Sequence, residues 1–168
     1  MAPRHPYVLK PSVGAGSIGA ARYEAADPRG AAHVAQLHAA GRTVMVQSYV
    51  EEVDDQGETA LIYVHGTFSH AVHKEPILTG WGKPAAEGLY VEEQMSAVEA
   101  TEQELELAER VFAALPFPRD QLLYARIDVL PGPLVLEVEL TEPSLFIGYA
   151  EGAAERFAAA IAATSRRR

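Results

Sequence analysis

Two pairs of strand-like segments are each joined by a turn of two or three residues, and this feature limits the fold of the chain most. The first turn is His65-Gly66, between segments 58–64 and 67–74, and the second is Pro131-Gly132-Pro133, between segments 122–130 and 134–140. Connections this short join antiparallel strands, because a parallel pair needs a crossover of a dozen residues or more. The chain is therefore expected to contain antiparallel sheet.

Further strands and three helices are expected around these hairpins. The strands are expected at 7–10, 20–23, 43–50 and 89–92. Asp27 followed by Pro28 is typical of a helix start, and Thr101 with Glu104 forms a capping box at the start of a second helix. A third helix is expected where apolar side chains recur at helical spacing between 153 and 161. Antiparallel strands with flanking helices indicate the α+β class.

The composition allows a well-packed core. The chain has 168 residues, of which 48% are hydrophobic and 22% are charged, and this suits one compact domain or two small lobes. It contains no cysteine, which excludes a disulfide scaffold, a cysteine-ligated zinc site and a cysteine nucleophile.

Neither a membrane nor a nucleic acid is an expected partner. The sequence has no apolar run of about 18 residues that could span a membrane, and its start lacks the apolar segment of a secretory signal, so we expect a cytoplasmic protein. The net charge of −9 repels DNA and RNA. A small anion such as ATP can still bind where lysines, backbone amides and a divalent metal offset that charge.

The second hairpin carries an unusual set of acidic side chains. Strand side chains alternate between the two faces of a sheet, so Arg126 and Asp128 share one face, as do Glu137 and Glu139. If Asp128 lies opposite Glu137, the three carboxylates converge with Arg126, whereas a slip of one residue turns the glutamates away. Oxygen ligands without histidine or cysteine suit magnesium or manganese. The alternative is an acidic hairpin face that only contacts solvent.

A glycine-rich loop follows the first expected strand. Gly14, Gly16 and Gly19 fit the pattern G-x-G-x-x-G, but a dinucleotide fold would open a long helix here, and the next segment is instead strand-like. A protein kinase is excluded as well, because Lys10 precedes the loop. Two interpretations stay open: a flap whose amides approach phosphate oxygens beside Lys10, and a surface turn beside an exposed lysine.

His65, His70, His73 and the single tryptophan, Trp81, are further candidate site residues. His70 and His73 alternate on one expected strand, so a zinc site with His65 is not favoured, while His70 shares a face with Lys74. Trp81 lies in a glycine-containing loop. It either packs against the sheet or covers a substrate.

Four segments, taken in order, resemble the ATP-grasp superfamily. They are 8–11 with the glycine loop, 44–50, 57–74, and the acidic hairpin over 124–143. The set is similar to the glutathione synthetase-like and RimK-like carboxylate–amine ligases, and within them to a subgroup that includes a cycloserine-type cyclo-ligase. The resemblance implies an ATP-grasp fold with ATP between two lobes, 1–50 and 51–168. It also implies a reaction in which ATP converts a carboxylate to an acyl phosphate that an amine captures.

The resemblance also implies a set of site residues. The phosphates of ATP would be held by Lys10 and by Gly14, Ala15, Gly16 and Ser17. The adenine would lie against Gln47, Ser48, Tyr49 and Val50, and the ribose against Glu58. Asp128, Glu137 and Glu139 would hold Mg²⁺ or Mn²⁺, and Arg126 and Lys74 would act in catalysis on the transferring phosphate.

The chain departs from the family in two respects. Glu139 stands where the family has an asparagine, which adds negative charge to the metal site. The family also has a preceding domain, and the first lobe here is truncated at its start. We therefore expect a ligase whose substrates are a small carboxylate and an amine, and which either forms a homo-oligomer or pairs with a separate chain that supplies the preceding domain. Two other hypotheses are a nucleotide-binding module without ligase activity of its own and an acidic structural domain.

Overall fold

The computed structural model describes residues 3–14, 16–78, 80–82 and 94–165. These residues form two compact units. The N-terminal unit contains the described residues up to Asp54 together with 76–78 and 80–82, and the C-terminal unit contains 55–75 and 94–165. The division therefore lies a few residues beyond the expected boundary at 50/51, and 76–78 and 80–82 return to the N-terminal unit. There the amide of Gly82 donates to the carbonyl of Arg22 (2.7 Å).

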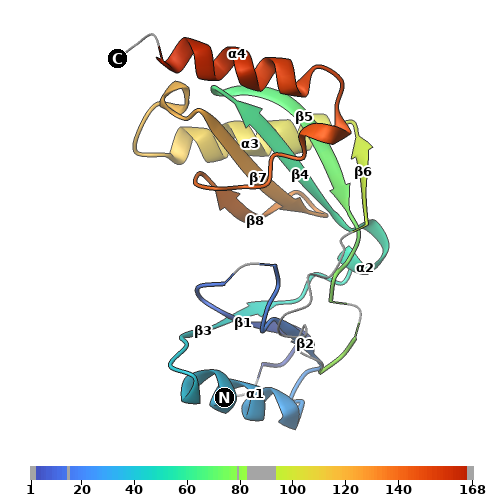
Figure 1. Cartoon of the computed structure of the whole chain (residues 1–168). Helices are drawn as coiled ribbons and strands as arrows, with labels where there is room; N and C mark the ends of the chain where they lie inside the picture. Colours follow the sequence, from blue (N-terminus) through green and yellow to red (C-terminus); the bar gives the residue numbers. More distant parts are fainter. Residues whose placement is uncertain (1–2, 15, 79, 83–93, 166–168) are drawn as a thin grey trace. The chain divides into compact units, whose positions relative to one another are not determined.

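The N-terminal unit is a three-stranded sheet with one helix against it (Figure 1). Its strand order is β2 (Ala21–Tyr23), β1 (Tyr7–Pro11) and β3 (Val44–Ser48), and both strand pairs are antiparallel. Helix α1 (Pro28–Ala39) is capped by the side chain of Asp27, which accepts a hydrogen bond from the amide of Arg29, and Pro28 stands at its start as predicted. Tyr7, Leu9, Ala21 and Tyr23 form the buried core of this unit.

The C-terminal unit is built on a five-stranded antiparallel sheet (Figure 1). Its strand order is β6 (Met95–Val98), β5 (Thr67–Lys74), β4 (Glu58–Val64), β7 (Tyr124–Leu130) and β8 (Leu134–Glu139). The first predicted hairpin is confirmed, and its turn places His65 and Gly66 at φ values of 48° and 76°, as a two-residue turn of type I′ requires. Strand β6 was not predicted, and the strand predicted at 89–92 lies outside the described residues.

The two faces of this sheet differ in character. On one face, Leu61, Tyr63 and Ile127 pack against α3 (Glu102–Ala114) in the largest core of the unit. The other face has a smaller apolar cluster of Ala60, Ile62 and Val72, with Met95, Leu145 and Phe146 packed against it, and it also carries charged side chains. Helix α4 (Ala153–Ser165) contacts β4 and β5. The short elements are α2 (Val53–Gln56) and the 3₁₀ turns η1 (Arg119–Gln121) and η2 (Ile147–Tyr149). Over the described ranges, no helix is both long and apolar enough to cross a bilayer.

The start of α3 gives a testable measure of local stability. The predicted capping box is present: the amide of Glu104 donates to the Thr101 hydroxyl, and the Glu104 carboxylate accepts from the amide of Thr101. Thr101→Ala is expected to lower the free energy of unfolding by about 1 kcal/mol, since the amide of Glu104 loses its side-chain acceptor. Urea unfolding followed by circular dichroism measures this change. Gln103→Ala, at an exposed position in the same turn, is the control and should change stability by less than about 0.5 kcal/mol.

Candidate functional site

Six charged side chains share the less apolar face of the five-stranded sheet. We call them the charged cluster: Glu58 on β4, Lys74 on β5, Arg126 and Asp128 on β7, and Glu137 and Glu139 on β8. Asp128 lies opposite Glu137, and Arg126 lies opposite Glu139. Directly opposed residues on antiparallel strands point to the same face. Of the two registers considered from the sequence, the structure therefore has the one in which the carboxylates converge.

A β-bulge produces this register. Next to the turn Val129 pairs with Val135, but the following pair is Asp128 with Glu137, so Leu136 is an extra residue on β8. Without the bulge, Asp128 would oppose Leu136 and both glutamates would point to the other face. Strand β8 is the outer strand of the described sheet, and Val138, on the face opposite the glutamates, is accordingly 37% exposed.

Asp128 is the buried centre of the cluster, with 1% of its surface exposed. Its carboxylate accepts from Arg126 through Nε (2.8 Å) and Nη2 (3.0 Å), and Lys74 Nζ lies 3.4 Å away. Lys74 also pairs with Glu58 at 2.6 Å. Two buried cations are thus balanced by carboxylates, as buried charges require.

Arg126 links the cluster to the segment that follows β8. Its Nη2 donates to Glu139 (2.8 Å), its Nη1 donates to the carbonyl of Ser144 (3.3 Å), and its guanidinium lies over the ring of Phe146. Burial disfavours the charged guanidinium, but the hydrogen bonds and charge of Asp128, followed by the charge of Glu139, raise the pKa of Arg126. The side chain is therefore held in place as a permanent cation.

The cluster carries an excess of negative charge. Its four carboxylates outnumber its two cations, which leaves a net charge of −2. Burial raises the pKa of Glu139, and the neighbouring carboxylates of Glu137 and Asp128 add to this effect against the opposing charge of Arg126. An oxygen-only donor set with this charge fits a hard divalent cation. Within the described part of the chain no three acidic or histidine side chains meet as metal ligands do, because Arg126 binds both Asp128 and Glu139.

Lys10 lies on the face of the N-terminal sheet that α1 does not cover. Tyr7 and Leu9 point toward the helix, so the alternate residue Lys10 points to the other face and is half-buried. Its neighbours on that face include Gln47, which is opposite Val8. Lys10 and Gln47, two of the residues implied by the resemblance, thus share one face of this unit.

The glycine loop has the backbone conformation that its composition suggests. Gly16 and Ser17 have φ values of 59° and 58°, in the left-handed region that glycine adopts at little cost. A Cβ atom added at Gly16 would meet no atom within 4 Å, so the loop is open on that side. Gly14 is described, whereas Ala15 lies outside the described residues.

Strand β3 presents one residue of the predicted adenine segment to its open edge. The amide of Tyr49 donates to the carbonyl of Pro6 (2.9 Å), and the amide of Ser12 donates to the carbonyl of Thr43 (2.8 Å). These bonds place alternate residues of β3, including Gln47, in the ladder with β1. Ser48 therefore directs its backbone N–H and C=O toward the edge that has no neighbouring strand in the described sheet.

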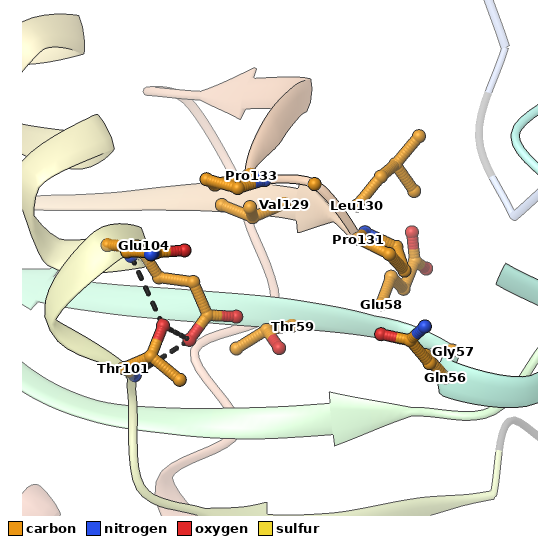
Figure 2. A pocket seen from close by; sticks show the side chains of 12 residues that line it. Gln56, Gly57, Glu58, Thr59, Thr101, Glu104, Val129, Leu130, Pro131 and Pro133 are labelled. Carbon is orange, nitrogen blue, oxygen red and sulfur yellow. Dashed lines mark hydrogen bonds between the residues drawn. The ribbon is translucent and has the colours of Figure 1, made fainter. Parts of the chain in front are cut away.

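Two pockets were found in the described C-terminal unit, and only the first is lined by a member of the charged cluster. The first, of about 180 Å³, lies between the start of α3 and the turn from β7 to β8, and Glu58 lines it with Gln56 and Thr59 (Figure 2). The second, of about 520 Å³, is lined by His70, Phe68 and Tyr149 among others. Glu58 is thus the residue that joins the cluster to a pocket.

His70 shares a face with Lys74, as expected, and its Nε2 contacts the carbonyl of Leu145 (3.0 Å). Three other residues near these sites, Arg22, His33 and Phe146, were not identified from the sequence. No motif or spacing separates them from other residues of their types. Trp81 packs at the sheet, with its ring 4.4 Å from the Arg22 guanidinium, in agreement with the first of its two interpretations.

His33 connects α1 to the end of the glycine loop. It is buried, its Nδ1 lies 3.0 Å from the Tyr23 hydroxyl, and the backbone of Gly19 contacts its ring. Burial lowers the pKa of His33, and the Gly19 contact opposes that shift. The neutral ring therefore links the loop to the core of the unit.

Comparison with known proteins gives a consistent result. The sequence model of the prokaryotic glutathione synthetase ATP-grasp domain matches residues 2–150. A cycloserine biosynthesis protein of Streptomyces lavendulae, DcsG, is 38% identical over 93% of this chain and 54% of that protein. A crystal structure of D-cycloserine synthetase DcsG is 34% identical, with a TM-score of 0.79 over 96% of this chain and 56% of that one.

A more distant likeness concerns the fold alone. A D-alanine–D-alanine ligase from Bacillus anthracis, in complex with ATP, is 21% identical, with a TM-score of 0.61 over 96% of this chain and 53% of that one. The chain thus spans about half the length of the proteins that it matches. The fold expected from the four sequence segments is confirmed.

Proposed function

Since the chain belongs to the prokaryotic glutathione synthetase ATP-grasp domain family, we propose that it binds ATP and magnesium for a carboxylate–amine ligase. In the proposed reaction a carboxylate oxygen attacks the γ-phosphorus of ATP, and ADP leaves. The amine nitrogen then attacks the acyl phosphate, the new C–N bond forms, and inorganic phosphate and a proton are released. Such a reaction needs positioning and cations more than covalent help from the protein.

The observation that carries this proposal is the charge of the cluster. Three carboxylates and Arg126 share one face of the sheet because of the Leu136 bulge, and Lys74 and Glu58 extend the cluster to β5 and β4. Its net charge of −2 equals the charge that one divalent cation neutralises. An acidic face that only contacts solvent would not bury its central aspartate to 1% exposure.

Each member of the cluster has a separate role in the proposal. Asp128, Glu137 and Glu139 would hold Mg²⁺, which when bound neutralises phosphate charge. Arg126 would stabilise charge on the transferring phosphoryl group, since a guanidinium presents several donors to phosphate oxygens. Lys74 would contact the γ-phosphate or the acyl phosphate as a point charge. Both cations are already held by carboxylates, so their positions are set before substrate arrives.

The N-terminal unit would bind the rest of the nucleotide. Lys10 and the loop of Gly14, Ala15, Gly16 and Ser17 would contact the phosphates. The open backbone edge of Ser48, within the segment of Gln47, Ser48, Tyr49 and Val50, would contact the adenine, and Glu58 of the C-terminal unit would contact the ribose. The open side of Gly16 and the outward groups of Ser48 support these assignments.

The substrates in this proposal are a small-molecule carboxylate and an amine of the amino-acid class. Two of the compared proteins are named for cycloserine and for D-alanine–D-alanine, and both of these compounds are built from amino acids. Because the chain spans about half of those proteins, its partner in the proposal is a separate chain that supplies a further domain, and the alternative is that the chain forms a homo-oligomer. We propose a cytoplasmic location, where ATP is available.

Calorimetric titration with a non-hydrolysable ATP analogue tests the nucleotide and metal sites together. The chain is expected to bind the analogue with Mg²⁺ and to bind it at least about 10-fold more weakly without the metal. Glu137→Gln is expected to weaken Mg²⁺-dependent binding by about 10-fold or more, the scale of losses at metal sites, with little change in stability because Glu137 is exposed. Glu155→Gln, exposed on α4, is the matched control. An affinity for the analogue that changes neither on removal of Mg²⁺ nor in Glu137→Gln would contradict the metal assignment.

A further inference from the structure

A buried arginine of the N-terminal unit lies between two aromatic rings. Arg22, on β2, is 5% exposed, and its guanidinium is 4.4 Å from the centre of the Trp81 ring and 5.1 Å from that of Tyr49. Its Nη1 donates to Asp54 Oδ2 (2.7 Å) and to the Tyr49 hydroxyl (2.7 Å). We call Arg22, Tyr49, Asp54 and Trp81 the Arg22 clamp.

The clamp fixes both roles of the Tyr49 hydroxyl. The hydroxyl accepts from Arg22 and donates to Asp54 Oδ1 at 2.6 Å. Burial, and then the hydrogen bond to Asp54, raise the pKa of Tyr49 to about 12, so the hydroxyl remains a donor at neutral pH. The Trp81 ring meets the Tyr49 ring edge-on at 5.8 Å. The Tyr49 side chain is therefore held from three directions.

The clamp lies on the same face of the sheet as the proposed nucleotide contacts. Arg22 and Gln47 both oppose Val8, one from each neighbouring strand, and directly opposed residues share a face. Tyr49 follows Ser48, and its amide is bound to the carbonyl of Pro6. Holding the Tyr49 side chain thus fixes the end of β3 at the residue whose backbone groups point to the open edge.

We propose that Arg22 is a positioning residue for nucleotide binding, because it holds Tyr49 and thereby the Ser48 backbone in the orientation that receives the adenine. This inference rests on the proposed function and adds a role that acts through Tyr49. Stability alone does not account for a buried arginine, since apolar side chains of similar volume often replace buried ion pairs without loss of stability. A planar guanidinium that is stacked and hydrogen-bonded at the same time fixes the orientation of the side chains that it contacts.

Trp81 offers a direct spectroscopic readout of the clamp. It is the single tryptophan of the chain, and its ring contacts both Arg22 and Tyr49. Indole emission responds to nearby charge and to solvent. Titration of the wild-type chain with a non-hydrolysable ATP analogue and Mg²⁺ is therefore expected to change Trp81 emission with the same dissociation constant that calorimetry gives.

Two substitutions test the positioning role. Arg22→Lys keeps the charge and loses the planar stack, and Tyr49→Phe keeps the ring and loses both hydroxyl bonds. Each is expected to weaken analogue binding by about 3- to 10-fold, the scale of ordering one or two side chains on binding, and to shift Trp81 emission before nucleotide is added. Thermal unfolding checks that each variant folds. If Arg22→Lys does not fold, Tyr49→Phe alone tests the positioning role.

The matched control is Arg119→Lys in the C-terminal unit. Arg119 also pairs with a carboxylate, Glu109, and lies over an aromatic ring, Phe112, so its loss tests the same chemistry away from β3. Unchanged affinity is expected for it. If folded Arg22→Lys and Tyr49→Phe bind like wild type, the inference is wrong and the proposed function stands. If the wild-type chain binds no analogue with Mg²⁺, both are wrong.

Discussion

Replacing Asp128 by asparagine is expected to lower the free energy of unfolding by about 3–5 kcal/mol, the usual loss when one partner of a buried ion pair is removed. Asp128 is 1% exposed and accepts two hydrogen bonds from Arg126, with Lys74 at 3.4 Å. Asparagine keeps the shape but removes the charge, so two buried cations lose their central counter-charge. Urea unfolding followed by circular dichroism gives the value.

The control for this result is Asp120→Asn. Asp120 is an exposed aspartate of η1 in the same unit, and its substitution should change stability by less than about 0.5 kcal/mol. A loss below about 1 kcal/mol for Asp128→Asn would mean that Glu58 and Glu139 balance Lys74 and Arg126 by themselves. The cluster would then be less interdependent than its geometry indicates.

Gly57→Ala is expected to destabilise the chain by about 2–4 kcal/mol, as the sum of a left-handed backbone and an overpacked site. Gly57 precedes β4 with φ at 61°. A Cβ atom there would overlap the carbonyl oxygen of Lys74 and lie 2.6 Å from Cε1 of His73. The methyl group must therefore push β4 away from β5 at the pair Glu58–Lys74, and weaker analogue binding should accompany the loss of stability.

Gly41→Ala separates the two causes. Gly41 has a similar φ of 71°, but a Cβ atom at this position would meet nothing within 4 Å, so only the backbone cost of about 1–2 kcal/mol is expected. Thermal unfolding of the two variants side by side measures the difference. Equal losses would show that the strands next to Gly57 separate without cost.

Local sequence signals predicted the elements whose cause is local. The caps at Asp27 and Thr101 and the turn at His65-Gly66 depend on residues within four positions of one another, and each is present as predicted. Strand β6 and the short helix α2 were not predicted. Met95–Val98 is mostly exposed and lacks clear alternation, so its strand conformation comes from pairing with β5.

The candidate site was predicted only as far as residue types allow. The sequence pattern placed Arg126 and Asp128 on the same face of their strand, and Glu137 and Glu139 on the same face of theirs. It left open whether the two pairs lie on the same face of the sheet. The resemblance to the ATP-grasp family supplied the roles. Arg22 was not identified, because its partners Tyr49, Asp54 and Trp81 are 27, 32 and 59 positions away, and only packing brings them together.

The sequence by itself determined that the chain folds into antiparallel hairpins with an acidic second hairpin. Two β-bulges, visible only in the tertiary structure, decided what those hairpins present. The bulge at Ser69 pairs Glu58 with Lys74 instead of His73, and the bulge at Leu136 pairs Asp128 with Glu137. Side chains on a strand alternate with a period of two, so one extra residue exchanges the faces of everything beyond it. No local pattern specifies that extra residue; it is set by how the whole sheet packs.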